Sequence, residues 1–297
     1  MAKETTTTTT TGLPLADSQR LHFDIYAILE GSQELYLGHE VQVNVNLVET
    51  VKLSTKDGQE IEKCYLSPTK RRGVERRCLL WSPVKSGELL SDKLDCGIPK
   101  TCAKVDCPIC SVYGGLIAGN KTLIGRVTHG GGVAIQKIYP EEKQRAMHPS
   151  RLASPEEGKD ETPIPFKRQY NQPGILYPVS NHALSITEPD FYAVAYAFLD
   201  SLPRIGSGNP KGIAIAEHEN TPLLVVDKYL SPRGKRPLIS PSQTDPQQAI
   251  SDFLRLAKGE EDTNHIQASH FDRWIGDEAL EKLQDYAGQF VDTVLQA

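Results

Sequence analysis

Runs and alternations of apolar residues predict several strands along the chain. Residues 22–29, "HFDIYAIL", form a short apolar run of the kind found in buried strands. Residues 41–54 alternate valine or leucine with polar side chains, which predicts a half-buried strand. Further strands are expected at 122–138, where three consecutive glycines interrupt the pattern, and at 175–186, 213–216 and 223–230.

Four helices are also predicted, two between these strands and two after them. The first begins near Thr69 and extends to about residue 92, and the second begins at the capping-box-like sequence Thr187–Asp190. The last two occupy about 246–258 and 277–295, and the apolar residues of the last helix lie on one face. The order strand, helix, strand, strand, helix, strand is that of an RRM-like or ferredoxin-like sheet, an α+β fold.

The charge of the chain is patterned. The 297 residues carry a formal net charge of −5, which argues against a general nucleic-acid binder. Residues 63–77, however, hold six basic residues and one acidic residue, whereas residues 259–297 hold nine acidic and two basic residues. A cationic surface is therefore expected to be local.

The sequence shows no sign of a membrane or secretory protein. No apolar run approaches the ~20 residues of a membrane-spanning helix, and the Thr-rich segment 1–20 has no apolar signal region. We expect this segment to be a disordered lead-in and the protein to be cytoplasmic, where thiols stay reduced. The sequence also contains none of the common hydrolase or metalloprotease motifs, so an enzyme is not expected.

Four of the six cysteines lie within fifteen residues, with the spacing C-x5-C-x4-C-x2-C: Cys96, Cys102, Cys107 and Cys110. Two residues between thiolates allow both sulfurs to bind one tetrahedral ion, so the spacing favours a structural zinc site. Scattered buried thiols, or a redox or disulfide role, are the alternatives, and His129 is a possible substitute ligand. Cys64 and Cys78 are expected to be small core residues.

The sequence "SPTKRRGVERR" places five cations around Gly73: Lys70, Arg71, Arg72, Arg76 and Arg77. On a helix that begins near Thr69, Arg72 and Arg76 share a face, and Lys70 and Arg77 point in roughly the same direction two turns apart. Helix N-terminal amides and arginines together suit phosphates, although a solvated helix face is the alternative. The glycine-rich segment 204–212 fits no phosphate-binding motif and predicts a tight loop in which Lys211 can contact a ligand.

In their order, these segments resemble the repeated backbone subunit of CRISPR effector complexes, a RAMP-superfamily protein of the Cas-seven type, and most closely its type I-D version. The resemblance lies in the strand order, in "SPTKRRGVERR", in "CAKVDCPICSVYGG" and in "LPRIGSGNPKGIAIAE". It implies an RRM-like core over 21–230 with three insertions, followed by a C-terminal helical region over 231–297. The insertions are a lid (34–67), a zinc-binding loop (93–115) and a thumb (139–174).

The resemblance also implies a function. Such a subunit polymerises head to tail along a CRISPR guide RNA (crRNA) and presents it for pairing with target DNA, while base pairing supplies the sequence specificity. Its partners would be crRNA, copies of itself and other subunits of the complex. The guide phosphates would be bound by Lys70, Arg71, Arg72, Arg76 and Arg77, with Lys167, Arg168 and Lys211 as further candidates.

Two other functions remain open at this point. One is a stand-alone, monomeric, zinc-containing RNA-binding protein. The other is a nuclease of the same fold that cuts its target with a carboxylate of the thumb, where the candidates are Glu141, Glu142, Glu156, Glu157, Asp160 and Glu161. A solvated loop is the simpler interpretation of these acidic residues.

Overall fold

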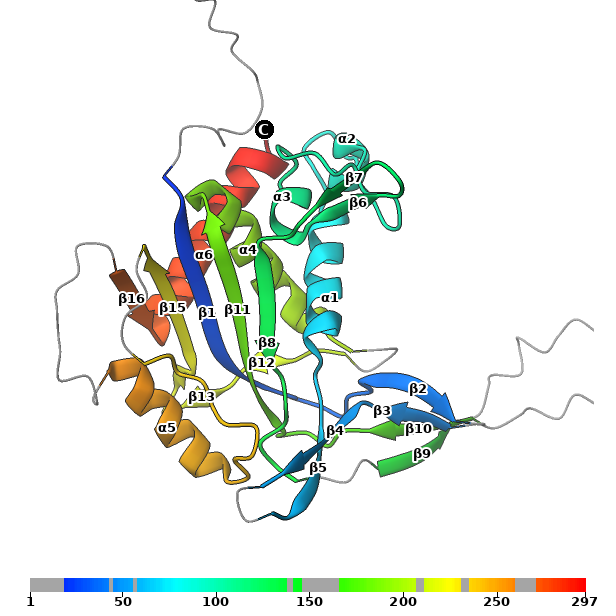
Figure 1. The fold of residues 1–297 in the computed structure, drawn as a ribbon, viewed down its shortest axis with the longest axis vertical. Coiled ribbons are helices and arrows are strands. Elements are labelled where there is room, and N and C mark those ends of the chain that lie inside the picture. The colour runs from blue at the N-terminus through cyan, green and yellow to red at the C-terminus, as the bar shows by residue number, and fades with distance from the viewer. Residues whose placement is uncertain are drawn as a thin grey trace, which may run out of the picture.

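An antiparallel sheet forms the centre of the fold (Figure 1). The structure is a computed structural model, and it describes residues 19–42, 45–55, 58–137, 141–145, 166–206, 211–230, 235–259 and 271–297. The strands lie in the order β16-β15-β1-β11-β8, and the short β12 (Ala214–Ile215) pairs with β1. Their bounds are Leu21–Glu30 (β1), Val127–Gly131 (β8), Leu176–Ile186 (β11), Leu224–Tyr229 (β15) and Phe271–Ile275 (β16). The mixed α+β class predicted from the sequence is confirmed.

Both faces of β1 are buried, which explains its continuous apolar sequence. Phe23, Ile25 and Leu29 belong to the larger core, together with residues of α1 (Pro68–Leu80), α4 (Glu188–Ser201) and α6 (Asp277–Phe290). Tyr26 and Ile28 point to the other face and pack with α5 (Pro246–Lys258). Because successive side chains of a strand alternate between faces, one strand contributes to two cores.

The predicted start of α4 is confirmed. Thr187 Oγ1 accepts a hydrogen bond from the Asp190 backbone N–H at 3.2 Å, and the Asp190 carboxylate accepts one from the Thr187 N–H at 3.4 Å. This reciprocal pair satisfies two N–H groups that have no partner within the helix. The helices predicted at 246–258 and 277–295 are also present: α5 begins after its N-cap Asp245, and α6 continues through a π-helical turn at Val291–Leu295.

The helix predicted over 69–92 is shorter than expected. It ends at Leu80, and a separate short helix, α2, occupies Leu90–Leu94. Pro83 explains the break, because proline has no N–H to donate and disfavours helical geometry at the preceding Ser82.

The strands predicted at 41–54 and 122–138 are divided. The first region holds β2 (Gly38–Gln42), β3 (Val45–Val48) and β4 (Thr50–Ser54), and β4 pairs with β5 (Glu60–Cys64). The second holds β7 (Lys121–Leu123), which pairs with β6 (Gly115–Ile117), and then β8. A Cβ at Gly132 would lie 2.0 Å from the Leu66 carbonyl oxygen, so the backbone that leads into α1 passes too close for any side chain there.

Two long insertions meet in one peripheral sheet. Its order is β2-β3-β10-β9, where β9 is Glu141–Arg145 and β10 is Phe166–Tyr170. Because β10 pairs in parallel with β3, strands from the segments predicted as lid and thumb lie side by side.

The C-terminal region, predicted to be helical, also contributes the edge strand β16 to the central sheet. Arg273 of this strand donates hydrogen bonds to both carboxylate oxygens of Asp227 in β15, each at 2.7 Å. In the described ranges, no helix combines the length and apolar character needed to cross a membrane.

Candidate functional site

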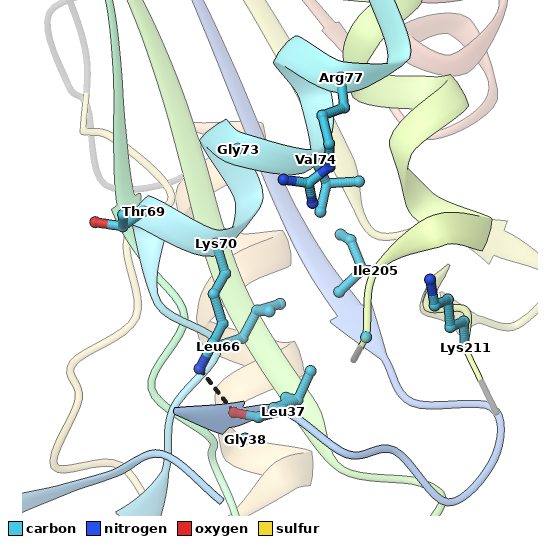
Figure 2. A pocket seen from close by; sticks show the side chains of 11 residues that line it. Leu37, Gly38, Leu66, Thr69, Lys70, Gly73, Val74, Arg77, Ile205 and Lys211 are labelled. Carbon is cyan, nitrogen blue, oxygen red and sulfur yellow. Dashed lines mark hydrogen bonds between the residues drawn. The ribbon is translucent and has the colours of Figure 1, made fainter. Parts of the chain in front are cut away.

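A groove of about 410 Å³ runs along the N-terminal half of α1 (Figure 2). Three parts of the chain form it: the helix itself, the segment Leu37–Gly38 at the start of β2, and the segment that follows α4. The lining residues are Leu37, Gly38, Leu66, Thr69, Lys70, Gly73, Val74, Arg77, Ile205, Gly206 and Lys211.

Three cations lie around this groove: Lys70, Arg77 and Lys211 (Figure 2). Lys70 donates to the Leu37 carbonyl oxygen at 2.7 Å and forms an ion pair with Glu49. The charged ends of Arg77 and Lys211 form no hydrogen bond or ion pair with any described residue. The groove therefore carries positive charge that none of the described residues neutralises by a direct contact.

The helical spacing predicted for Lys70 and Arg77 is confirmed, since both line this groove two turns apart on α1. Lys211 joins them from a segment far away in sequence. Its backbone carbonyl accepts a hydrogen bond from the side chain of Gln33, which lies in the loop between β1 and β2, so this contact holds the segment beside that loop.

Arg71 was expected to bind phosphate, but the structure places it inside the molecule. It is 1% exposed, and its guanidinium donates to Asn181 Oδ1 at 2.9 Å and to the Gly130 carbonyl oxygen at 2.5 Å. Burial lowers its pKa to about 10, and the charge of Glu75 opposes this shift. Arg71 thus connects α1 to β8 and β11 and is not available to a ligand.

Glu75 is the centre of this buried network. Its carboxylate lies 2.7 Å from His129 Nε2 and accepts hydrogen bonds from the Tyr113 hydroxyl at 2.9 Å and the Asn181 amide at 3.0 Å. Burial raises the pKa of the carboxyl, but the charges and hydrogen bonds of His129, Arg71 and Asn181 outweigh it, so the pKa lies below its usual value. The group of described residues whose ligand atoms converge consists of the four cysteines and does not include His129, whose Nε2 pairs with Glu75 instead.

The remaining basic residues of this segment also lie outside the groove. Arg72 is exposed and donates to the Tyr113 carbonyl oxygen. Arg76 is half-buried, and its Nε and Nη2 have no hydrogen-bond partner among the described residues. Lys63 is buried and donates to the Pro241 and Gln243 carbonyl oxygens.

The thumb candidates are only partly described. The backbones of Lys167 and Arg168 lie in β10, opposite Val45 and Asn46 of β3. Of the six carboxylates in that insertion, Glu141 and Glu142 belong to β9. The others, Glu156, Glu157, Asp160 and Glu161, fall outside the described residues.

The four clustered cysteines converge, as their spacing predicts. The sulfur atoms of Cys96, Cys102, Cys107 and Cys110 all lie within 4.8 Å of one another. Cys110 Sγ is 3.5 Å from Cys96 Sγ and 3.7 Å from Cys102 Sγ. Sulfurs bound at about 2.3 Å around a tetrahedral zinc lie about 3.8 Å apart, so this arrangement is compatible with zinc.

The protonation of the cluster also suits a cation. Hydrogen bonds with Cys107 and Cys110 lower the pKa of the Cys96 thiol, and hydrogen bonds with Cys110 and Cys96 raise the pKa of Cys107. The thiols therefore titrate as one interacting group, and a bound cation would stabilise their thiolate forms. No disulfide joins any of the six cysteines in the structure, and Cys64 and Cys78 are buried as expected.

Sequence patterns did not single out Leu37, Gly38, Ile205 or Gly206 as groove residues. Gly206 has a φ of +131°, a conformation that side chains rarely adopt, and it lies where the chain turns after α4. The glycines of the segment 204–212 were therefore the available signal, but nothing in the sequence places that segment against α1.

The chain has distant structural neighbours. No protein-family model and no curated protein matches it. A structure described as the crystal structure of Thermofilum pendens Csc2 is 14% identical, with 93% of this chain and 85% of that chain covered at a TM-score of 0.49. A chain of a "Type IV-B CRISPR Complex" is 14% identical, with 74% and 96% covered at a TM-score of 0.38.

A chain of a "CRISPR RNA-guided surveillance complex" is 13% identical, with 85% of this chain and 87% of that chain covered at a TM-score of 0.44. At such identities and TM-scores, a function for this protein has to be argued from its own residues. These residues define an α+β protein with a local cationic groove and a separate cluster of four thiols.

Proposed function

We propose that this protein is a Cas-seven-type backbone subunit of a type I CRISPR surveillance complex, and that it binds guide RNA in the groove beside α1. One observation carries most of the proposal. The two segments "SPTKRRGVERR" and "LPRIGSGNPKG", which resemble the family separately, line the same groove with Lys70, Arg77 and Lys211.

The groove suits a nucleic-acid backbone for physical reasons. Lysine and arginine contacts to phosphates do not depend on base identity, so a protein that uses them holds any guide sequence. Since the chain as a whole carries −5, a local cationic groove restricts the nucleic acid to one path. Guide and target can then pair while the protein holds the backbone.

The central sheet supports an RRM-like core in this proposal. Along the chain, its main elements follow the order β1, α1, β8, β11, α4, β15, and in space the strands lie antiparallel as β15-β1-β11-β8. The subunit would polymerise along crRNA in the cytoplasm, contact other subunits and target DNA, and perform no catalysis. The type I-D version is the one whose motifs this sequence resembles most.

The cysteine cluster would hold a structural zinc in this protein. With four thiolate ligands, zinc has no open position for a substrate, so it would act by ordering the loop that contains the ligands. That loop continues into α3 (Cys110–Tyr113), whose Tyr113 contacts both Arg72 and Glu75 of α1. The zinc would thereby support the helix that lines the groove.

The test is binding of single-stranded RNA by fluorescence anisotropy over a series of salt concentrations. The double variant Lys70→Glu/Arg77→Glu should bind at least tenfold more weakly, and the slope of log affinity against log salt should fall by about 0.7 for each lost phosphate contact. Lys121→Glu/Lys258→Glu changes the charge equally at two exposed positions outside the groove and should bind like the wild type.

Equal binding by both double variants would remove the groove from the proposal. A protein that purifies without RNA and shows no affinity for RNA at low salt would contradict the proposed function as a whole.

A further inference from the structure

The groove beside α1 continues into a second hollow of about 330 Å³ at the C-terminal end of the helix. Val74, Arg77, Gly206 and Lys211 line both, so a bound chain can pass from one into the other. The second hollow is more aromatic and also contains Trp81, Tyr196 and Pro203.

Trp81 is the notable residue of this hollow, because its side chain is 62% exposed. It is the C-cap of α1, where its backbone N–H donates to the Arg77 carbonyl oxygen at 3.0 Å. The neighbouring Ser82 hydroxyl bonds the Cys78 carbonyl oxygen at 2.7 Å and the Tyr196 hydroxyl at 3.0 Å. These bonds fix the end of the helix, and the Trp81 side chain attached there lines the hollow.

No ring or cation contact within the described part of the chain explains why this indole is exposed. Among the described residues, no aromatic ring or cation contacts the Trp81 indole, whereas Lys282 lies 5.3 Å from the ring of Trp274. Burying an aromatic side chain usually contributes about 1.5–3 kcal/mol, which this exposed position forgoes. An exposed indole beside a ligand groove is therefore better explained by a ligand than by stability.

The charges around the hollow indicate which ligand. Asp200 is its one acidic residue, and Arg204 pairs with it at 2.5 Å, so the two charges compensate each other. Arg77 and Lys211 remain positive. An aromatic platform beside uncompensated cations is the arrangement that binds single-stranded nucleic acid, in which bases stack on rings and phosphates meet lysine and arginine.

We propose that Trp81 stacks on a nucleobase of the RNA whose phosphates lie in the groove beside α1. This inference rests on the proposed function and deepens it, because it assigns a base-contacting residue to a site otherwise made of phosphate contacts. Every base has an aromatic face, so the contact holds one nucleotide without selecting its identity.

The test uses the fluorescence of Trp81 together with binding measurements. The chain has two tryptophans, so Trp274→Phe leaves Trp81 as the only indole. Titration with single-stranded RNA should quench its emission, whereas an abasic strand of equal length should bind through its phosphates without quenching. Trp81→Ala should weaken RNA binding roughly 5- to 150-fold, leave binding of the abasic strand unchanged, and be largely rescued by Trp81→Phe.

The outcomes separate this inference from the proposed function. If RNA binds and Lys70→Glu/Arg77→Glu releases it, but Trp81→Ala binds as tightly as the wild type, the stacking proposal fails and the groove remains. If Trp81→Ala abolishes self-association and leaves RNA affinity unchanged, the hollow receives a second copy of the chain and stacking is also overturned. If no variant or strand shows any RNA binding, both proposals fail together.

Discussion

At the scale of single residues, neighbouring cations of α1 have opposite roles. Arg71 is buried beside Glu75, whereas Arg77 lines the groove without a described partner. We expect Arg71→Ala to lower the free energy of unfolding by about 3–5 kcal/mol, because it removes a buried charge that favours ionised Glu75 and leaves the buried Asn181 Oδ1 and the Gly130 carbonyl oxygen without this donor. The matched change Arg77→Ala should alter it by no more than about 0.5 kcal/mol.

Urea denaturation of both variants measures this difference. Arg77→Ala should instead weaken RNA binding while the fold stays intact. Equal stabilities would show that the buried network contributes little to the folded state.

Glu75 should also make stability depend on pH. Its pKa is lower in the folded protein than the ordinary glutamate value of 4.5, so the folded state favours the ionised carboxylate. The resulting stabilisation is present above about pH 4.5 and is lost as the pH falls through the lower folded value. In Glu75→Gln this part of the acid dependence should disappear, so the difference in unfolding free energy from the wild type should shrink below pH 4.5. A difference that stays constant from pH 7 to pH 3 would contradict the assignment.

At the scale of elements, the cysteine loop should depend on its metal. Elemental analysis of purified protein should find one zinc per chain, and Cys107→Ser should lose most of it because a four-thiolate site needs every ligand. Chelation should lower the melting temperature of the wild type and leave that of Cys107→Ser unchanged. Cys78→Ala, outside the cluster, should keep its zinc. Equal zinc contents in Cys107→Ser and the wild type would rule out the site.

The capping box of α4 gives a second prediction at this scale. Thr187→Ala removes the hydroxyl that accepts from the Asp190 N–H, and should cost about 1 kcal/mol of unfolding free energy. Thr187→Ser keeps the acceptor and should lose much less. Chemical denaturation of both compares them, and equal losses would show that packing rather than the hydrogen bond matters at this fully buried position.

At the scale of the whole molecule, the proposed function predicts an assembly. If the chain is a backbone subunit, several copies should bind one RNA, and their number should rise in steps as the RNA becomes longer. Light scattering after size-exclusion chromatography measures this stoichiometry. A single copy bound at every RNA length would favour the stand-alone RNA-binding protein instead.

Local patterns predicted the elements whose signals are local. The apolar run of β1, the start of α4, the extent of α5 and the cysteine spacing are all confirmed. Predictions failed where a close approach or a partner decides the outcome. The strand β16 has only a weak pattern of its own and is held by pairing with β15. The helix predicted over 69–92 is a different case, because the signal that ends it, Pro83, is local.

The sequence by itself determined which residues could form helices, strands and a four-sulfur cluster, because capping, periodicity and ligand spacing act between near neighbours. Tertiary structure alone decided that Arg71 lies inside while Lys70 and Arg77 line the groove, and that Lys211 joins them from beyond α4. The physical reason is that burial and charge depend on what packs against a helix. For the cations of α1, burial or exposure was decided by β8, β11 and the segment after α4, which lie far from α1 along the chain.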